Sequence, residues 1–107
     1  MTTVPMFKSL RGDSGNITVP GLGAVVGEFR SWNLMRREGN GPTVWTLHAV
    51  FRYKNETLLK NPKMRDWFKI RLKLGKDTKI DLCLWESLEI EGDRLIAEGV
   101  QQCQKQT

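Results

Sequence analysis

Apolar residues recur at every second position through much of the chain, whereas the three- and four-residue spacing of helices is brief. The segment 67–74 places its apolar residues in one phase and Trp67, Lys69, Arg71 and Lys73 in the other. Residues 80–91 continue the alternation, and Glu86 is an exception that predicts a bulge or a barrel rim. This period is typical of half-buried β-strands.

Turn residues between the strand segments predict hairpins. Matching the apolar phases across residues 75–79 gives one register, which pairs Leu74 with Ile80, Leu72 with Leu82, Ile70 with Leu84, Lys73 with Asp81, and Lys69 with Trp85. Gly92 and Asp93 suit a two-residue turn. That turn predicts a second hairpin, which pairs Ile90 with Leu95, Leu88 with Ala97, and Glu91 with Arg94.

Upstream, residues 25–37 and 43–54 predict a third hairpin, joined by the turn-forming residues 38–42. Phe29 and Trp32 are out of phase, which predicts a bulge at Arg30 and Ser31. The second arm has one apolar face, which we expect in the core: Trp45, Leu47, Ala49, Phe51 and Tyr53.

Two shorter segments complete the prediction. Residues 16–20 predict a short edge strand that Pro20 ends. Residues 55–60 predict a short helix with Asn55 as its N-cap, and Pro62 prevents the helix from continuing.

Strands interrupted by one short helix predict an all-β fold, a small curled antiparallel sheet or β-barrel. The order of elements resembles an OB-type barrel in general plan, and a β-sandwich fits the same pattern. The length of 107 residues predicts a single domain, 1–107, with flexible ends at 1–16 and 101–107.

Several classes of protein are disfavoured. No apolar run reaches the length of a membrane span, and residues 1–21 lack the apolar segment of a secretory signal. Cys83 and Cys103, with His48 as the one histidine, lack the usual zinc-site spacing. We therefore expect no metal and no cofactor, two free thiols, and a reducing, cytoplasmic compartment.

The chain also offers little for catalysis. His48 has no identifiable partner for general acid or base chemistry, and Cys83 lies near Asp81, which raises rather than lowers a thiol pKa. The glycine-rich segments lack the spacing of a phosphate-binding loop. We expect a protein that is not an enzyme and has no small-molecule substrate.

Charge is unevenly distributed along the chain. Seventeen basic and twelve acidic residues give a net charge of +5. Residues 25–75 hold eleven basic and four acidic residues, a net +7, whereas residues 76–107 hold four basic and seven acidic residues, a net −3. The basic middle suits a polyanion, and the opposite charge blocks suit head-to-tail association of copies.

Aromatic residues lie among the basic ones in the middle of the chain. Lys and Arg bind phosphates, and unstacked bases stack on aromatic faces. We expect a surface for single-stranded DNA or RNA, in which Lys69, Arg71 and Lys73 contact phosphates, Trp67 and Trp32 stack on bases, and Arg36, Arg37, Arg52 and Lys54 add charge.

Other interpretations fit the same residues. A row of lysine and arginine also serves as a solvated outer face that prevents unwanted strand pairing. The main alternative is a structural or assembly protein, such as a virus matrix-like subunit, that forms homo-oligomers through its opposite charge blocks and outward Trp67 and Trp85. An adaptor or inhibitor that binds an acidic protein is a further alternative.

Overall fold

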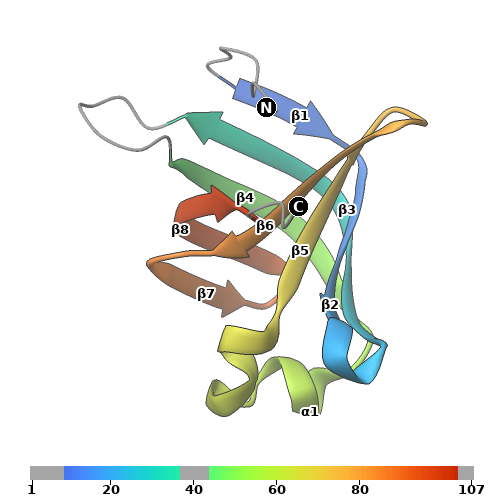
Figure 1. Ribbon diagram of the computed structural model, residues 1–107, viewed down its shortest axis with the longest axis vertical. Helices are drawn as coiled ribbons and strands as arrows, with labels where there is room; N and C mark the ends of the chain where they lie inside the picture. The colour runs from blue at the N-terminus through green and yellow to red at the C-terminus, as the bar shows by residue number, and fades with distance from the viewer. Residues whose placement is uncertain (1–8, 37–43, 104–107) are drawn as a thin grey trace.

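The computed structural model describes residues 9–36 and 44–103. Strands dominate this part of the chain (Figure 1). The elements in order are β1 (Ser9–Gly12), β2 (Ser14–Val19), η1 (Pro20–Leu22), β3 (Ala24–Arg36), β4 (Trp45–Tyr53), α1 (Glu56–Leu59), η2 (Pro62–Trp67), β5 (Lys69–Leu74), β6 (Thr78–Leu84), β7 (Ser87–Glu91) and β8 (Arg94–Gln102).

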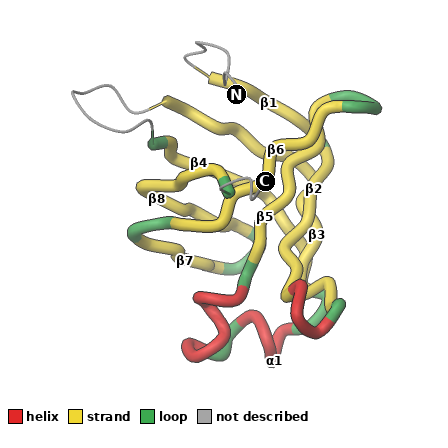
Figure 2. Tube along the Cα trace, in the orientation of Figure 1, coloured by secondary structure: helices red, strands yellow, loops and turns green. Residues whose placement is uncertain are grey.

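Six of these strands close into a barrel in which every pairing is antiparallel. The ring runs β3, β2, β5, β6, β8, β4 and back to β3. β1 and β7 lie outside the ring, paired with β3 and β8 respectively, and the short helices gather at one end (Figure 2). The ring confirms the small antiparallel barrel expected from the alternation. It has six strands where an OB-type barrel has five.

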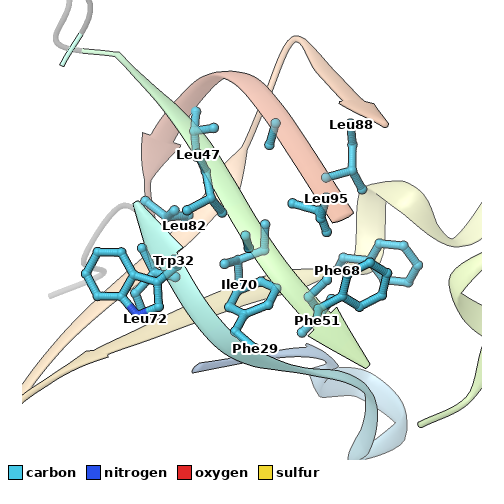
Figure 3. Close-up of a cluster of buried hydrophobic side chains, with 14 of the residues drawn as sticks. Phe29, Trp32, Leu47, Phe51, Phe68, Ile70, Leu72, Leu82, Leu88 and Leu95 are labelled. Carbon is cyan, nitrogen blue, oxygen red and sulfur yellow. The ribbon is translucent and has the colours of Figure 1, made fainter. Parts of the chain in front are cut away.

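The inward side chains of the barrel strands form one apolar core (Figure 3). The predicted inner face of β4 is confirmed, since Trp45, Leu47, Ala49 and Phe51 are buried and Tyr53 packs against them. The other buried residues of the core are Ile17, Val19, Val26, Phe29, Trp32, Leu34, Leu59, Phe68, Ile70, Leu72, Ile80, Leu82, Leu88, Leu95, Ala97 and Val100.

The hairpin of β3 and β4 contains the predicted bulge. The register shifts between Phe29 and Ser31, so Arg30 and Ser31 are both exposed while Phe29 and Trp32 both point inward. The second predicted hairpin, β7 with β8, has the expected register, including Glu91 opposite Arg94. Gly92 in its turn has φ 62°, a conformation that favours glycine. The turn predicted at 38–42 lies outside the described residues. The two arms of that hairpin, β3 and β4, agree with the prediction over the residues that are described.

The predicted register of β5 and β6 is wrong by two residues. Leu74 pairs with Thr78 and Leu72 with Ile80, because the turn contains only residues 75–77, with Gly75 at φ 74°. A shift of two residues keeps every side chain on its own face, so matching apolar faces does not distinguish the two registers. As a result Asp81 lies opposite Arg71 rather than Lys73.

The first strands correct two expectations. β2 is not an edge strand, because it pairs with β3 on one side and β5 on the other. The flexible ends were expected at 1–16 and 101–107. Residues 9–16 lie mostly in β1 and β2, and Gln101 and Gln102 belong to β8. Residues 1–8 and 104–107 lie outside the described part of the chain. The predicted helix cap is confirmed, since the side chain of Asn55 accepts a hydrogen bond from the backbone N–H of Leu58 at 3.1 Å.

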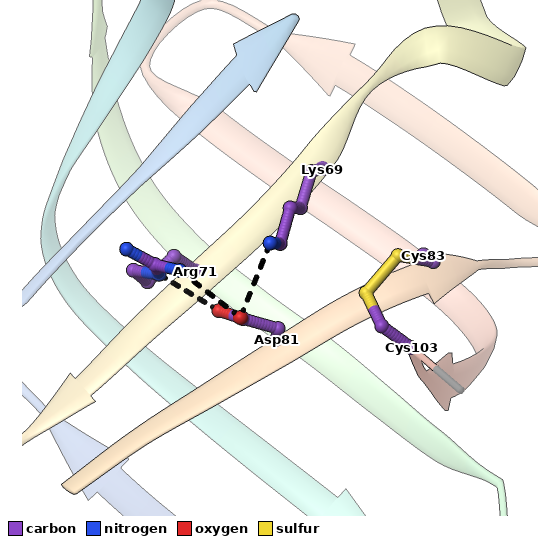
Figure 4. The surroundings of a disulfide bond; sticks show 5 residues. All are labelled: Lys69, Arg71, Asp81, Cys83 and Cys103. Atoms are coloured by element: carbon purple, nitrogen blue, oxygen red, sulfur yellow. Dashed lines mark hydrogen bonds and ion pairs between the residues drawn. A yellow bond between two sulfur atoms is a disulfide. The ribbon is translucent and has the colours of Figure 1, made fainter. Parts of the chain in front are cut away.

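The prediction of two free thiols is wrong. Cys83 and Cys103 form a disulfide, drawn in Figure 4. They are twenty residues apart in sequence, but β6 and the end of β8 are neighbours in the ring. The backbone N–H of Cys103 also donates to the backbone carbonyl of Asp81 at 2.9 Å. The pairing depends on strand order, which the spacing of the two cysteines does not reveal.

Candidate functional site

The three residues predicted to contact phosphates lie on the outer surface of β5. Lys69, Arg71 and Lys73 alternate with buried Ile70 and Leu72. The corrected register adds Lys79, which lies opposite Lys73. We call the four cations, Lys69, Arg71, Lys73 and Lys79, the basic face.

One carboxylate lies within the basic face. Asp81 accepts two hydrogen bonds from Arg71, at 2.8 Å from Nε and 3.1 Å from Nη2, and forms an ion pair with Lys69 at 3.3 Å (Figure 4). The hydrogen bond from Arg71 is the main reason that the pKa of Asp81 is lowered, and Lys69 lowers it further, although partial burial opposes the shift. The same contacts raise the pKa of Arg71.

Asp81 leaves part of the basic face available to a ligand. Four cations around one carboxylate give the face a net charge of +3. Lys73 and Lys79 are exposed. Arg71 uses its Nε and Nη2 toward Asp81, so its Nη1 can still donate to a ligand. The carboxylate therefore orders two of the cations and removes one unit of charge.

Short polar side chains lie beside the basic face on β2. Ser14, Asn16 and Thr18 are opposite Lys73, Arg71 and Lys69 in the register. All three are half-buried, and the Oδ1 of Asn16 accepts no hydrogen bond within the described residues. The outer side of β2 thus forms a strip of short polar side chains, Ser14, Asn16 and Thr18, along the row of cations. Sequence reasoning missed this strip, because it depends on the pairing of distant strands.

The aromatic residues predicted to stack differ in their placement. Trp67 is 64% exposed, but it ends η2 rather than beginning β5, which starts at Lys69. Trp32 is only 3% exposed, and its Nε1 donates to the backbone carbonyl of Ser14 at 2.7 Å. The expected stacking role of Trp32 is therefore wrong, because the bulge turns its ring into the core. Trp85 is half-buried against the core rather than outward.

The supporting cations are spread over other surfaces. Arg52 is exposed and lies opposite Glu28, and Lys54 forms an ion pair with Glu28 at 3.4 Å. β3 and β2 separate β4 from β5, a gap of roughly 14 Å at the usual strand spacing. Arg36 lies at the far end of β3, and Arg37 is outside the described residues. The structure thus brings together Lys69, Arg71 and Lys73, and the supporting cations that it describes, Arg36, Arg52 and Lys54, do not join them.

The described residues contain no group of three or more His, Cys, Asp or Glu side chains placed to hold a metal ion. Within the same ranges, no helix has the length and apolar character needed to cross a membrane. No protein-family model, curated protein or solved structure matches the chain.

Proposed function

We propose that this protein binds single-stranded DNA or RNA, without catalysing a reaction, through the basic face and the adjoining strip of β2. The observation that carries the proposal is the outward grouping of Lys69, Arg71, Lys73 and Lys79 around one carboxylate. Alternate residues on a strand repeat at roughly 6.6 Å, close to the stride of an extended single strand. Phosphates bound there would release counterions and gain affinity at low salt.

Trp67 supports a single strand over a duplex. It lies two residues before Lys69 and is the most exposed of the large apolar side chains in the described residues. An indole at the end of a row of cations provides a surface on which an unpaired base stacks. Bases within a duplex are already stacked on each other and gain nothing comparable.

Binding of labelled single-stranded oligonucleotides, measured by fluorescence anisotropy at several salt concentrations, tests the proposal. We expect a slope of log affinity against log salt of about −0.7 for each phosphate contacted. The double variant Lys73→Glu with Lys79→Glu should lose at least about tenfold in affinity. The matched variant Lys60→Glu with Lys63→Glu has the same net charge but changes the helical end, and it should bind within about threefold of wild type. Equal losses in both variants would refute a localised site.

Self-association is the second candidate. Among the described strands β7 pairs with β8 alone, so it lies outside the ring, and its Glu89 and Glu91 are exposed. A strand edge of this kind, with acidic side chains, suits the basic face of another copy. Sedimentation without nucleic acid separates the candidates, because assembly alone predicts a size that increases with protein concentration.

The expected cytoplasmic location is not part of this proposal. It depended on two free thiols and on the lack of a recognisable secretory signal, and the disulfide removes the first of these two grounds. Disulfides persist mainly in oxidising compartments and are rare in the cytosol.

A further inference from the structure

A second polar surface lies on the opposite wall of the barrel from the basic face. β1, β3, β4, β8 and β7 follow one another side by side, and their outer surface is hollowed over β3 and β4. The hollow has a volume of about 360 Å³, which lies at the small end of the range for small-molecule sites. One cross-strand row runs through it, with Arg11 opposite Asn33 and Asn33 opposite His48.

The polar side chains that line the hollow are unengaged. Arg11, His48 and Arg94 are exposed, and none forms a hydrogen bond or ion pair with another described residue. No described acidic residue lines the hollow, although Glu91 lies opposite Arg94 on the neighbouring strand. Two guanidinium groups and an imidazole around one hollow favour an anionic ligand, and the guanidinium fork matches a phosphate.

Asn33 adds a group that can recognise more than charge. Its Oδ1 is shielded from solvent and accepts no hydrogen bond within the described residues. Turning Oδ1 toward a ligand therefore breaks no hydrogen bond at that atom. An asparagine amide offers one acceptor and two donors, the pattern that pairs with the edge of a nucleobase.

Apart from Ser31, the rest of the lining is apolar and lies on a sheet surface. Val50 and Ile96 are half-buried beside His48, and the inward-facing Trp32, Ala49 and Leu95 also line the hollow. A ring system can lie on such a surface. Phosphate, a flat ring and a hydrogen-bonding edge occur together in a nucleotide.

We infer that this hollow binds a nucleotide, with its phosphate toward Arg11 or Arg94 and its base edge at Asn33. A free nucleotide and one unit of a strand offer the same chemistry. The inference does not rest on the basic face, because Lys69, Arg71, Lys73 and Lys79 do not line this hollow. Arg11 also lines a separate hollow beside Lys73, so the test keeps Lys73 unchanged.

The test is a titration of the ¹⁵N-labelled protein with adenosine monophosphate, followed by NMR. We expect shifts at residues 31–33, 48–50 and 94–96, and a dissociation constant that rises at least about tenfold in Arg11→Gln with Arg94→Gln. Asn33→Leu should weaken binding of the nucleotide by about fivefold or more but leave binding of inorganic phosphate unchanged. Lys69→Gln with Lys79→Gln is the matched control, because neither residue lines the hollow, and it should leave nucleotide binding within about twofold.

The outcomes separate the two proposals. Absence of shifts in the hollow with millimolar nucleotide, or an equal effect of the control variant, would overturn the inference. Neither result would count against single-strand binding by the basic face. A short oligonucleotide that binds the hollow more tightly than the mononucleotide, and still does so in the control variant, identifies the source as a strand. Tighter binding of the mononucleotide identifies a free nucleotide.

Discussion

The disulfide should contribute a large share of the stability of this barrel. β6 and β8 form the least extensive pairing in the ring, with Leu82 opposite Gln102 and Leu84 opposite Gln101 in register. Cys83 and Cys103 link the two strands covalently at this seam, across a sequence separation of 20 residues. Closing a loop of that length reduces the entropy of the unfolded chain by an amount worth about 3 kcal/mol at 25 °C.

The measurement is thermal and urea unfolding of the oxidised protein against Cys83→Ser with Cys103→Ser. A loss of about 3 kcal/mol corresponds to a decrease in Tm of roughly 12–24 °C for a domain of this size. Wild-type protein treated with a reductant should match the double serine variant, which controls for the substitutions themselves. An unchanged Tm after reduction would contradict this prediction, as would two reactive thiols in native protein that has not been treated with a reductant.

Four further predictions concern the outer surface and the close strand packing. Asp81→Asn should bind single strands more tightly and with a salt slope steeper by up to about 1.4, because two cations lose their carboxylate; an unchanged slope contradicts this. Because the folded pKa of Asp81 is lowered, its contribution to stability is present above the unfolded pKa and is lost as pH falls through the folded pKa. The difference in unfolding free energy between wild type and Asp81→Asn should therefore shrink below about pH 4, as followed by urea titrations. Gly15→Ala should cost about 1–3 kcal/mol, because its Cβ would lie 2.6 Å from the backbone carbonyl of Arg71, whereas Gly21→Ala, with open space, should stay within about 0.5 kcal/mol; equal urea midpoints would contradict the packing. Trp67→Ala should weaken single-strand binding by about 1–3 kcal/mol in anisotropy measurements, while Tm stays unchanged because the ring is exposed; a normal affinity would exclude stacking there.

The period of two in the sequence predicted the core-facing side chains of β4, β5 and β8, but not how the strands align. The β7–β8 register was predictable because a two-residue turn with Gly92 leaves little freedom. The β5–β6 register was not, because residues 75–79 allow turns of different length with the same faces inward. In the observed register Asp81 lies opposite Arg71 instead of the predicted Lys73. Lys79 lies opposite Lys73 and so belongs to the basic face.

The bulge in β3 illustrates a second limit. The sequence predicted an irregularity at Arg30 and Ser31, and the register shift confirms it. A bulge changes the phase of every residue that follows, so Trp32 turns inward. The disulfide and the polar strip on β2 depend on which strands are neighbours across the closed ring, and no local pattern in the sequence specifies that order.

We propose that a single strand lies along β2, β5 and β6. The most direct measurement is the set of backbone amide shifts in the ¹⁵N-labelled protein when a single-stranded oligonucleotide of about 12 nucleotides is added at low salt. We expect the largest shifts in residues 14–18, 67–73 and 79–81, and we expect them to disappear as salt is raised. Shifts concentrated in β7 and the first half of β8, or no shifts at any salt concentration, would exclude this placement of the strand.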